Sequence, residues 1–189
     1  MNPALLLIDI QNDYFPGGKW ELHRAEQAAS QAGKILAHFR DRHLPAFHIQ
    51  HINLKQGAAF FLPDTPGAEI HPLVAPQPGE EHIVKHAPDS FYRTDLQARL
   101  ERRKIDHLVV CGMMTHMCVD TTVRAARNFG YGITLIENAC ATKDLLWNET
   151  SIAAYTVQAA FMASLSGTFA EISTAAPWIE RMQADIRSN

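Results

Sequence analysis

Ala4-Leu5-Leu6-Leu7-Ile8 is an uninterrupted run of apolar residues near the start of the chain, and Asp9 ends it. A strand with one face in water alternates apolar and polar residues, whereas an unbroken apolar run is typical of a strand buried on both faces. Such strands occupy the middle of parallel sheets that helices cover on both sides. The run therefore predicts a central strand of an α/β protein.

Helical and apolar patterns alternate along the rest of the chain. Helical spacing from Ala25 to Phe39 predicts a helix over about 24–43, and Pro45 precedes a strand predicted over Ala46 to Ile52. The remaining patterns predict strands over 82–85, 107–111, 133–137 and 168–172, and helices over 94–103, 118–129, 149–164 and from about 175. This βαβα order predicts a three-layer α/β/α, Rossmann-like fold with an open, mostly parallel sheet of about six strands.

Two helix ends and one long segment add detail to this prediction. Thr94 is expected to cap the start of the helix at 94–103, and Gly130 to follow the end of the helix at 118–129. The segment 53–80 is rich in proline and has little periodicity. A loop of that length in a compact domain is usually functional, so we expect it to form a lid or a pocket wall.

Composition narrows the class of protein. The chain has 189 residues, which predicts one domain over 1–189, and its 17 basic against 20 acidic residues leave a net charge of −3. The absence of a basic surplus argues against nucleic acid and anionic membranes as partners. Three cysteines, an odd number, argue against a disulfide framework. No apolar run is long enough for a membrane span, and the first residues lack a secretory pattern. We therefore expect a cytoplasmic protein.

Three chemically active side chains stand at or just beyond the ends of apolar runs: Asp9, Lys85 and Cys118. In open parallel sheets, ligands bind outside the carboxyl ends of the strands. Cys118 opens a helical pattern, and a helix N-terminus lowers the pKa of a thiol and can receive an oxyanion. A carboxylate could take the thiol proton while an ammonium stabilises negative charge. Together they predict a nucleophilic site. Each also has a structural explanation: Asp9 as the cap of a turn, Lys85 as a side chain that reaches solvent, and Cys118 as a small buried residue.

Four segments then occur in a characteristic order along the chain. They are LLIDIQNDYF at 6–15, IVK at 83–85, SFYRTDL at 90–96 and VCGMMTHMCV at 110–119. The ordered set closely resembles the isochorismatase-like cysteine hydrolases, over about residues 4–170. This family includes nicotinamidases, N-carbamoylsarcosine amidase and the isochorismatases themselves.

The resemblance implies a set of catalytic roles. Cys118 would be the nucleophile, Asp9 the general base and Lys85 the charge stabiliser. The resemblance also implies a cis peptide bond between Met113 and Met114, which places the N–H groups of Met114 and Cys118 as an oxyanion hole. It implies cleavage of an amide, carbamoyl or ureido C–N bond of a small molecule through a thioester, without a cofactor. Family members are commonly dimers or tetramers, so it further implies a homo-oligomer.

A metal site is the first point at which the match is partial. Nicotinamidases carry an Asp-x-His metal motif, but the comparable strand here reads AFHIQH and has no aspartate two residues before a histidine. His48 and His51 are three residues apart and point to opposite faces of a strand. We therefore expect no metal ligands, although His71 could in principle approach His51.

The predicted substrate pocket consists of Tyr14, His51, Phe91 and His116, with Phe60, Phe61 and Trp147 as weaker candidates. Tyr14 and Phe91 adjoin the motifs of Asp9 and Lys85, and each could equally be a core residue. His116 stands where many family members have aspartate, and it could contact substrate or hydrogen-bond the backbone of its turn.

Three alternatives to a cysteine amidohydrolase stay open. An isochorismatase-type hydrolase cleaves a vinyl ether without a cysteine nucleophile and would keep its activity in a Cys118→Ala variant. A thiol redox sensor would need a resolving cysteine, and the chain has no Cys-x-x-Cys pair. A catalytically silent binding module would tolerate replacement of Asp9 and Lys85. Catalysis by a pair of Cys118 and His116 would leave Asp9 and Lys85 unexplained.

Overall fold

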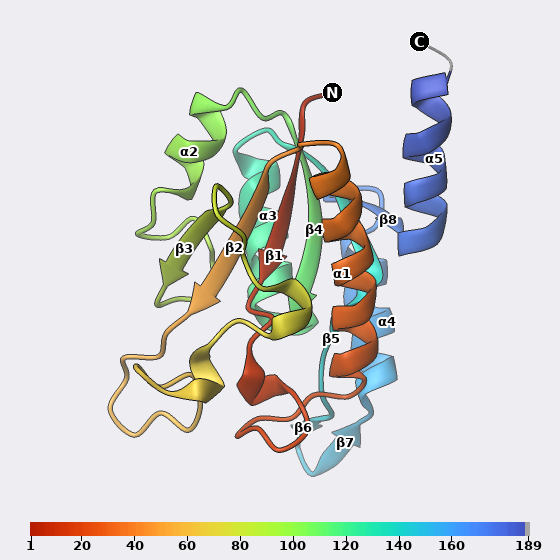
Figure 1. Cartoon of the computed structure of the whole chain (residues 1–189). Coiled ribbons are helices and arrows are strands. Elements are labelled where there is room, and N and C mark those ends of the chain that lie inside the picture. Colours follow the sequence, from red (N-terminus) through yellow and green to blue (C-terminus); the bar gives the residue numbers. More distant parts are fainter. Residues whose placement is uncertain (188–189) are drawn as a thin grey trace.

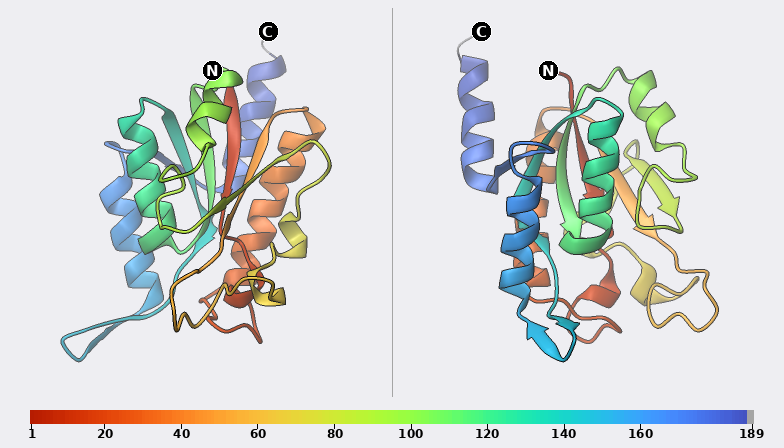
Figure 2. Two further views of the ribbon diagram at one scale, coloured as in Figure 1. Left: turned by 90° about the vertical axis from the view of Figure 1, so that its left-hand side faces the viewer. Right: turned by 180° about the vertical axis from the view of Figure 1, so that it is seen from behind.

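A computed structural model describes residues 1–187 as a six-stranded parallel sheet with helices on both faces (Figures 1 and 2). Across the sheet the strands are β3 (Glu81–Lys85), β2 (Ala46–His51), β1 (Pro3–Ile8), β4 (His107–Met113), β5 (Gly132–Ala141) and β8 (Glu171–Ser173). The predicted three-layer α/β fold with about six strands is confirmed. Ser188 and Asn189, which end the predicted domain, lie outside the described residues.

Strand β1 shows why its apolar run is unbroken. Leu5 and Leu7 pack into the core beneath α1 (Ala25–Asp41) and α5 (Ala175–Arg187), whereas Leu6 and Ile8 pack into the core on the other face. That second face is covered by α2 (Leu96–Arg102), α3 (Asp120–Asn128) and α4 (Ala154–Leu165) (Figure 2). Because successive strand residues point to opposite faces, every residue of β1 is buried. Each buried leucine stabilises the fold by about 1.5–3 kcal/mol.

The predicted helix ends are partly right. Gly130 follows α3 with a φ of +91°, the left-handed conformation that ends many helices, so its predicted position is confirmed. The predicted cap at Thr94 is wrong, because α2 begins at Leu96 after Asp95. The Thr94 hydroxyl, one residue before the N-cap position, accepts from the Leu96 N–H at 3.4 Å and donates to the Ser90 carbonyl at 2.6 Å. No helix within residues 1–187 is both long and apolar enough to cross a membrane.

Two other predicted elements are displaced. The helix expected over 149–164 begins only at Ala154, because β6 (Leu145–Trp147) and β7 (Thr150–Ile152) form a hairpin. Its two turn residues, Asn148 and Glu149, both have positive φ, which matches the twist of a tight hairpin. The strand expected over 168–172 begins at 171, because the Gly167 N–H donates to the Ala170 carbonyl and closes a turn first.

The long segment after β2 lies at the carboxyl edge of the sheet (Figure 1). It contains two short turns of 3₁₀ helix, η2 (Pro66–Ala68) and η3 (Pro72–Val74). Backbone hydrogen bonds join it to the chain that leaves β1: Asn12 donates to Glu69, and His71 donates to Ile10. The segment is therefore anchored beside the residues that follow β1, which include the short 3₁₀ turn η1 (Asn12–Tyr14).

Candidate active site

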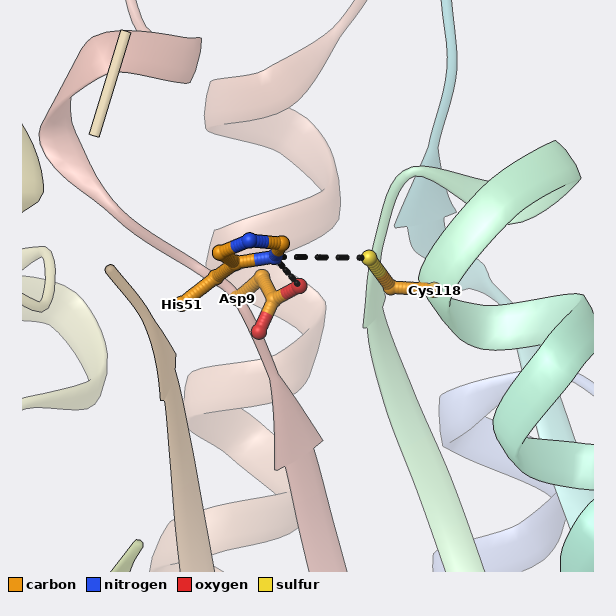
Figure 3. Close-up of side chains that lie close together, drawn as sticks. All are labelled: Asp9, His51 and Cys118. Atoms are coloured by element: carbon orange, nitrogen blue, oxygen red, sulfur yellow. Dashed lines mark hydrogen bonds and ion pairs between the residues drawn. The ribbon is translucent and has the colours of Figure 1, made fainter. Parts of the chain in front are cut away.

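Neighbouring strands end at one edge of the sheet, and four functional side chains meet there. The Lys85 Nζ atom lies 2.9 Å from Asp9 Oδ2. The His51 Nδ1 atom lies 3.8 Å from the same oxygen and 4.0 Å from the Cys118 sulfur. Figure 3 shows Asp9, His51 and Cys118 pointing toward one another from β1, β2 and the start of the helical segment after β4. The structure thus brings together the three residues of the predicted triad and adds His51.

The position of Asp9 follows from the way β1 ends. Asp9 has a φ of +51°, a left-handed conformation that aspartate tolerates better than most residues. Its N–H donates to the Ile49 carbonyl and its carbonyl accepts from the Gln11 N–H, both at 3.0 Å. This turn stops the strand and places the carboxylate beyond its carboxyl end.

Cys118 reaches the same edge through an unusual backbone. The peptide bond between Met113 and Met114 is cis, and the chain then makes one turn of π-helix, η4 (Thr115–Val119), before α3. Gly112 precedes this bend with a φ of +151°. A Cβ atom at Gly112 would lie 2.3 Å from the Ile8 carbonyl oxygen, so β1 and β4 can approach here only beside glycine.

Asp9 and Lys85 form a buried ion pair. Burial raises the pKa of Asp9, but the charge of Lys85 and the nearby His51 lower it more, and the net pKa is below its usual value. Burial lowers the pKa of Lys85, but Asp9 and Cys118 raise it above its usual value. The Lys85 ammonium also donates to the Pro88 carbonyl at 2.7 Å. Among the described residues, Asp9 Oδ1 has no hydrogen-bond partner, so this buried carboxylate retains a free acceptor.

The Cys118 thiol differs from the expectation of a lowered pKa. Burial raises its pKa, and the Asp9 carboxylate raises it further, against a smaller lowering by Lys85. The predicted effect of a helix N-terminus is outweighed because Cys118 is only 4% exposed and faces a carboxylate. It also sits inside η4, whereas α3 begins at Asp120. The resting pair is therefore a thiol beside a carboxylate, and the group that opposes ionisation is the base that can accept the proton.

Of the four predicted pocket residues, Tyr14 and His51 lie at the cluster. The pKa of the Tyr14 phenol is raised by burial and by the charges of Cys118 and Asp9. Phe91 and His116 are not brought to it. The Phe91 ring packs on Phe129 just past the end of α3, with centroids 5.1 Å apart, because the chain after Lys85 leads away from the edge.

His116 turns toward strand β5 instead of the cluster. Its Nδ1 atom lies 2.6 Å from the Thr142 hydroxyl, and its ring faces Phe161. His71 does not approach His51 either, since its ring stacks on Phe15 with centroids 3.7 Å apart. Trp147, one of the weaker pocket candidates, is 71% exposed on β6.

Two supporting residues were missed by the sequence analysis. The Gln11 side chain accepts from the His51 N–H at 2.7 Å and donates to the His51 carbonyl at 2.9 Å, so it clamps the backbone of that histidine. Asp13 accepts from the Phe61 N–H at 2.7 Å and holds the ring of Phe61 beside Tyr14. The only signal was their place directly after an apolar strand, and this does not show that polar residues turn inward.

A parallel α/β sheet with a buried thiol, carboxylate and ammonium at its carboxyl edge defines a class of protein suited to nucleophilic catalysis. Residues 3–176 match the family model described as the isochorismatase domain. The chain is 50% identical to the isochorismatase family protein YddQ of Bacillus subtilis over 174 residues, which are 92% of this chain and 97% of that protein. The chain therefore belongs to the isochorismatase family of hydrolases.

Two further comparisons place it within that family. A crystal structure of an isochorismatase-family protein from Oleispira antarctica superposes with a TM-score of 0.92 at 46% identity, covering 95% of this chain and 96% of that one. The nicotinamidase of Escherichia coli is 25% identical over 174 residues, covering 72% of this chain and 82% of the enzyme. The similarity therefore extends across most of the fold and includes the strands that carry the site.

Proposed function

We propose that this protein is a cysteine-dependent hydrolase that cleaves an amide, carbamoyl or ureido C–N bond of a small molecule through a thioester. The observation that carries the proposal is the buried ion pair of Asp9 and Lys85, 2.9 Å apart, beside the Cys118 thiol. Burying two charges costs several kcal/mol per ion, and a catalytic role accounts for a carboxylate that keeps a free oxygen there. The related nicotinamidase is, by its name, an amidase, which supports the choice of a C–N bond.

In the first step, Asp9 accepts the Cys118 proton while the sulfur attacks the carbonyl carbon of the substrate. The new C–S bond forms as the carbonyl π electrons move onto oxygen, giving a tetrahedral oxyanion. Lys85 keeps Asp9 ionised before the attack, as the lowered pKa of Asp9 indicates, and offsets the charge that develops. The backbone N–H groups of Met114 and Cys118 receive the oxyanion in this proposal, and one such donor lowers the barrier by about 3–4 kcal/mol.

In the second step, the protonated Asp9 gives its proton to the leaving nitrogen, the C–N bond breaks, and ammonia or an amine departs. The acyl group stays on sulfur as a thioester. Asp9, again a carboxylate, then removes a proton from water as the water oxygen attacks the thioester carbon. The C–S bond breaks, the proton returns to the sulfur, and the acid product leaves the resting enzyme.

The walls of the proposed pocket are Tyr14, His51 and Phe61. The Phe61 ring lies 4.6 Å from that of Tyr14 and 6.1 Å from that of His51, measured between centroids. Phe61 is fully buried, and Tyr14 is 1% exposed. These two aromatic rings make one side of the site apolar, which favours a compact acyl group next to the scissile bond.

Ammonia release from a panel of small amides, carbamoyl compounds and ureides tests the proposal. We expect release by the wild type and none above background by Cys118→Ala, with a trapped acyl-enzyme mass on Cys118 after acid quenching. Equal release by both proteins would exclude the cysteine mechanism. Hydrolysis of a vinyl ether by Cys118→Ala would assign the isochorismatase-type reaction instead.

We also propose that the protein is a cytoplasmic homo-oligomer. Three large apolar side chains are candidates for an interface between copies: Leu146 and Trp147 on β6 and Tyr155 on α4 are each more than 70% exposed. The three cysteines, Cys111, Cys118 and Cys140, are all free, as expected in a reducing compartment. Light scattering on the wild type and Trp147→Ser tests the first point, since a monomeric wild type would contradict it.

A further inference from the structure

The cluster at the carboxyl edge has a second chemical property besides the proposed catalysis. Asp9, His51 and Cys118 each offer one atom that can ligate a metal, and these atoms all lie within 4.8 Å of one another. Figure 3 shows the three side chains converging from separate segments of the chain. Among the side chains that the structure describes, no other group of this kind occurs. We infer that Asp9, His51 and Cys118 form a zinc-binding site in which the metal bonds to the Cys118 sulfur.

Two of the three ligand separations lie close to those of a zinc site. In a tetrahedral zinc site with Zn–S of about 2.3 Å and Zn–N or Zn–O of about 2.0–2.2 Å, neighbouring ligand atoms are about 3.3–3.6 Å apart. His51 Nδ1 lies 4.0 Å from the Cys118 sulfur and 3.8 Å from Asp9 Oδ2. The third pair, Asp9 and Cys118, has ligand atoms within 4.8 Å of each other, so rotation of these side chains toward a shared centre completes the geometry. Sulfur, imidazole and carboxylate are also the ligand types that zinc selects.

A free acceptor in the cluster is a second, independent observation. Asp9 is fully buried, and its Oδ1 atom has no hydrogen-bond partner among the described residues. Buried carboxylates normally have every oxygen paired, since an unpaired one costs free energy. The Lys85 Nζ atom lies 2.9 Å from Oδ2, and one carboxylate can bind an ion and the ammonium together.

The supporting residues prepare His51 for this role. Gln11 holds the His51 backbone at both its N–H and its carbonyl, which fixes the position from which the imidazole extends. His51 is also the most accessible ligand, because its side chain is 17% exposed against 0% for that of Asp9. A metal can therefore enter from the His51 side, with water as the fourth ligand.

The proton balance of binding is simple. Asp9 would ligate through a carboxylate oxygen and His51 through the lone pair of Nδ1. Cys118 must lose its proton, so the Zn–S bond replaces the S–H bond and one proton leaves to solvent for each zinc bound. Because zinc then holds the sulfur that must attack the substrate and lies among the residues that surround it, zinc binding and formation of the thioester exclude each other. Zinc is thus an inhibitor of the proposed hydrolase and not its cofactor.

Direct binding tests this inference without any substrate. The full-length protein, freed of metal with a chelator and desalted under reducing conditions, is titrated with Zn²⁺ against a chromophoric chelator. Co²⁺ is used in parallel because a cobalt–thiolate bond gives a charge-transfer absorption band. We expect one Zn²⁺ per chain, a cobalt–thiolate band, and release of one proton per ion. Affinity should rise with pH because the thiol must ionise.

Matched variants locate the site. We expect Cys118→Ala to abolish the cobalt–thiolate band and, like His51→Gln, to weaken Zn²⁺ binding at least tenfold. Cys140→Ala and His82→Asn remove a thiol and an imidazole outside the cluster and should change the affinity less than twofold. Equal Zn²⁺ affinity in wild type and Cys118→Ala, or no binding by folded wild type at micromolar Zn²⁺, would overturn the inference. Circular dichroism checks that each variant is folded. If His51→Gln does not fold, the result for Cys118→Ala alone decides whether the zinc site exists.

Activity supplies a separate readout. One equivalent of Zn²⁺ should stop ammonia release by the wild type, and excess chelator should restore it. The inference does not depend on the proposed function, because a protein that binds Zn²⁺ through Cys118 but hydrolyses no substrate would refute only the latter. An active enzyme that binds no Zn²⁺ would refute only the zinc site.

Discussion

Strand β2 carries two histidines three residues apart, and each joins a different cluster of charges. His48 Nε2 lies 2.9 Å from Glu80 Oε2, and Arg40 donates to both oxygens of that carboxylate, at 2.7 and 2.9 Å. The Gln77 N–H donates to it as well. His51, on the opposite face, lies near Asp9. The Asp9 Oδ2 atom lies 2.9 Å from the Lys85 ammonium, and its Oδ1 atom has no hydrogen-bond partner in the described part of the chain.

The difference teaches how a structural carboxylate is distinguished from a reactive one. The pKa of Glu80 is lowered to about 2, because Arg40, Gln77 and His48 together outweigh the opposing effect of burial, and the pKa of Asp9 is lowered too. The direction of the shift is therefore the same in both clusters. What differs is that Glu80 has its acceptors filled, whereas Asp9 keeps one open beside a thiol. An open acceptor next to a nucleophile, and not a perturbed pKa, marks the reactive cluster.

The largest effect is expected from the thiol of the reactive cluster. Replacing Cys118 with Ala should lower kcat/KM for the best substrate by roughly 10⁴-fold or more, because no other group forms the covalent bond. Cys140→Ala removes a buried thiol that lies outside the cluster and should stay within threefold of wild type. Ammonia release measures both, and similar losses in the two variants would show that packing, and not nucleophilicity, is at stake.

Replacing each of the two carboxylates, Asp9 and Glu80, with its amide tests whether only the reactive cluster contributes to catalysis. Asp9→Asn should lower kcat by roughly 10²–10⁴-fold, the usual contribution of a general acid–base group, with little change in KM. Glu80→Gln should leave kcat within twofold, because Glu80 contacts Arg40, His48 and Gln77 and none of the reactive residues. A comparable fall in kcat in Glu80→Gln would contradict the division of the two clusters.

Gly112 tests whether the close approach of β1 and β4 holds the reactive cluster. Gly112→Ala should destabilise the fold by about 3 kcal/mol, since its Cβ would lie 2.3 Å from the Ile8 carbonyl oxygen and its φ is +151°. Gly130→Ala is the matched control, with positive φ but no atom within 4 Å of its added Cβ, and should cost about 1 kcal/mol. Urea unfolding measures the free energy of unfolding of both variants. Equal losses would show that the contact with the Ile8 carbonyl adds nothing to the cost of positive φ.

The structural cluster should affect stability and its pH dependence. Glu80→Gln should lower the free energy of unfolding by about 1–3 kcal/mol near neutral pH, since hydrogen bonds to a charged group are lost. The Glu80 pKa falls from 4.5 to about 2 on folding, so its contribution is complete above 4.5 and disappears as the pH falls toward 2. Thermal unfolding of both proteins across this range should show the difference shrinking, and a constant difference would argue against an ionic contribution.

The smallest expected effect concerns the reactivity of the Cys118 thiol toward an alkylating reagent. Because Asp9 raises the pKa of Cys118, alkylation of Cys118 by iodoacetamide near neutral pH should be slower than that of a free cysteine. Asp9→Asn removes the negative charge and should shift the rate–pH profile to lower pH, speeding alkylation about tenfold at neutral pH while hydrolysis falls. Opposite changes in the two rates distinguish a general base from a structural carboxylate, and parallel losses would contradict this role.

The sequence predicted the strands well where a run of apolar residues reflects burial on both faces. It predicted β1 and β2 almost to the residue, because period and composition depend on local neighbours that the chain itself supplies. It did not predict the β6–β7 hairpin or the late start of β8. Those elements depend on tight turns at Asn148–Glu149 and at Gly167, where residues of ordinary type adopt positive φ or glycine closes a short loop.

The site shows the same division. Asp9, Lys85 and Cys118 could be found because a polar residue beyond an apolar strand falls at the carboxyl edge of a parallel sheet. Phe91 and His116 adjoin the same motifs, yet the structure turns them toward Phe129 and Thr142. Adjacency in sequence does not set the direction of a side chain once the chain leaves a regular strand.

By itself, then, the sequence determined the α/β class, the order of the strands along the chain and the residues that stand at their carboxyl ends, because hydrophobic periodicity is a local property. The sequence also proposed His51 as a pocket residue. The tertiary structure alone decided how close His51 lies to Asp9 and Cys118, that Gln11 holds its backbone, and that burial beside a carboxylate raises the pKa of the Cys118 thiol. These features depend on distances between segments far apart in the chain and on the removal of water from between them. Local sequence patterns predict neither.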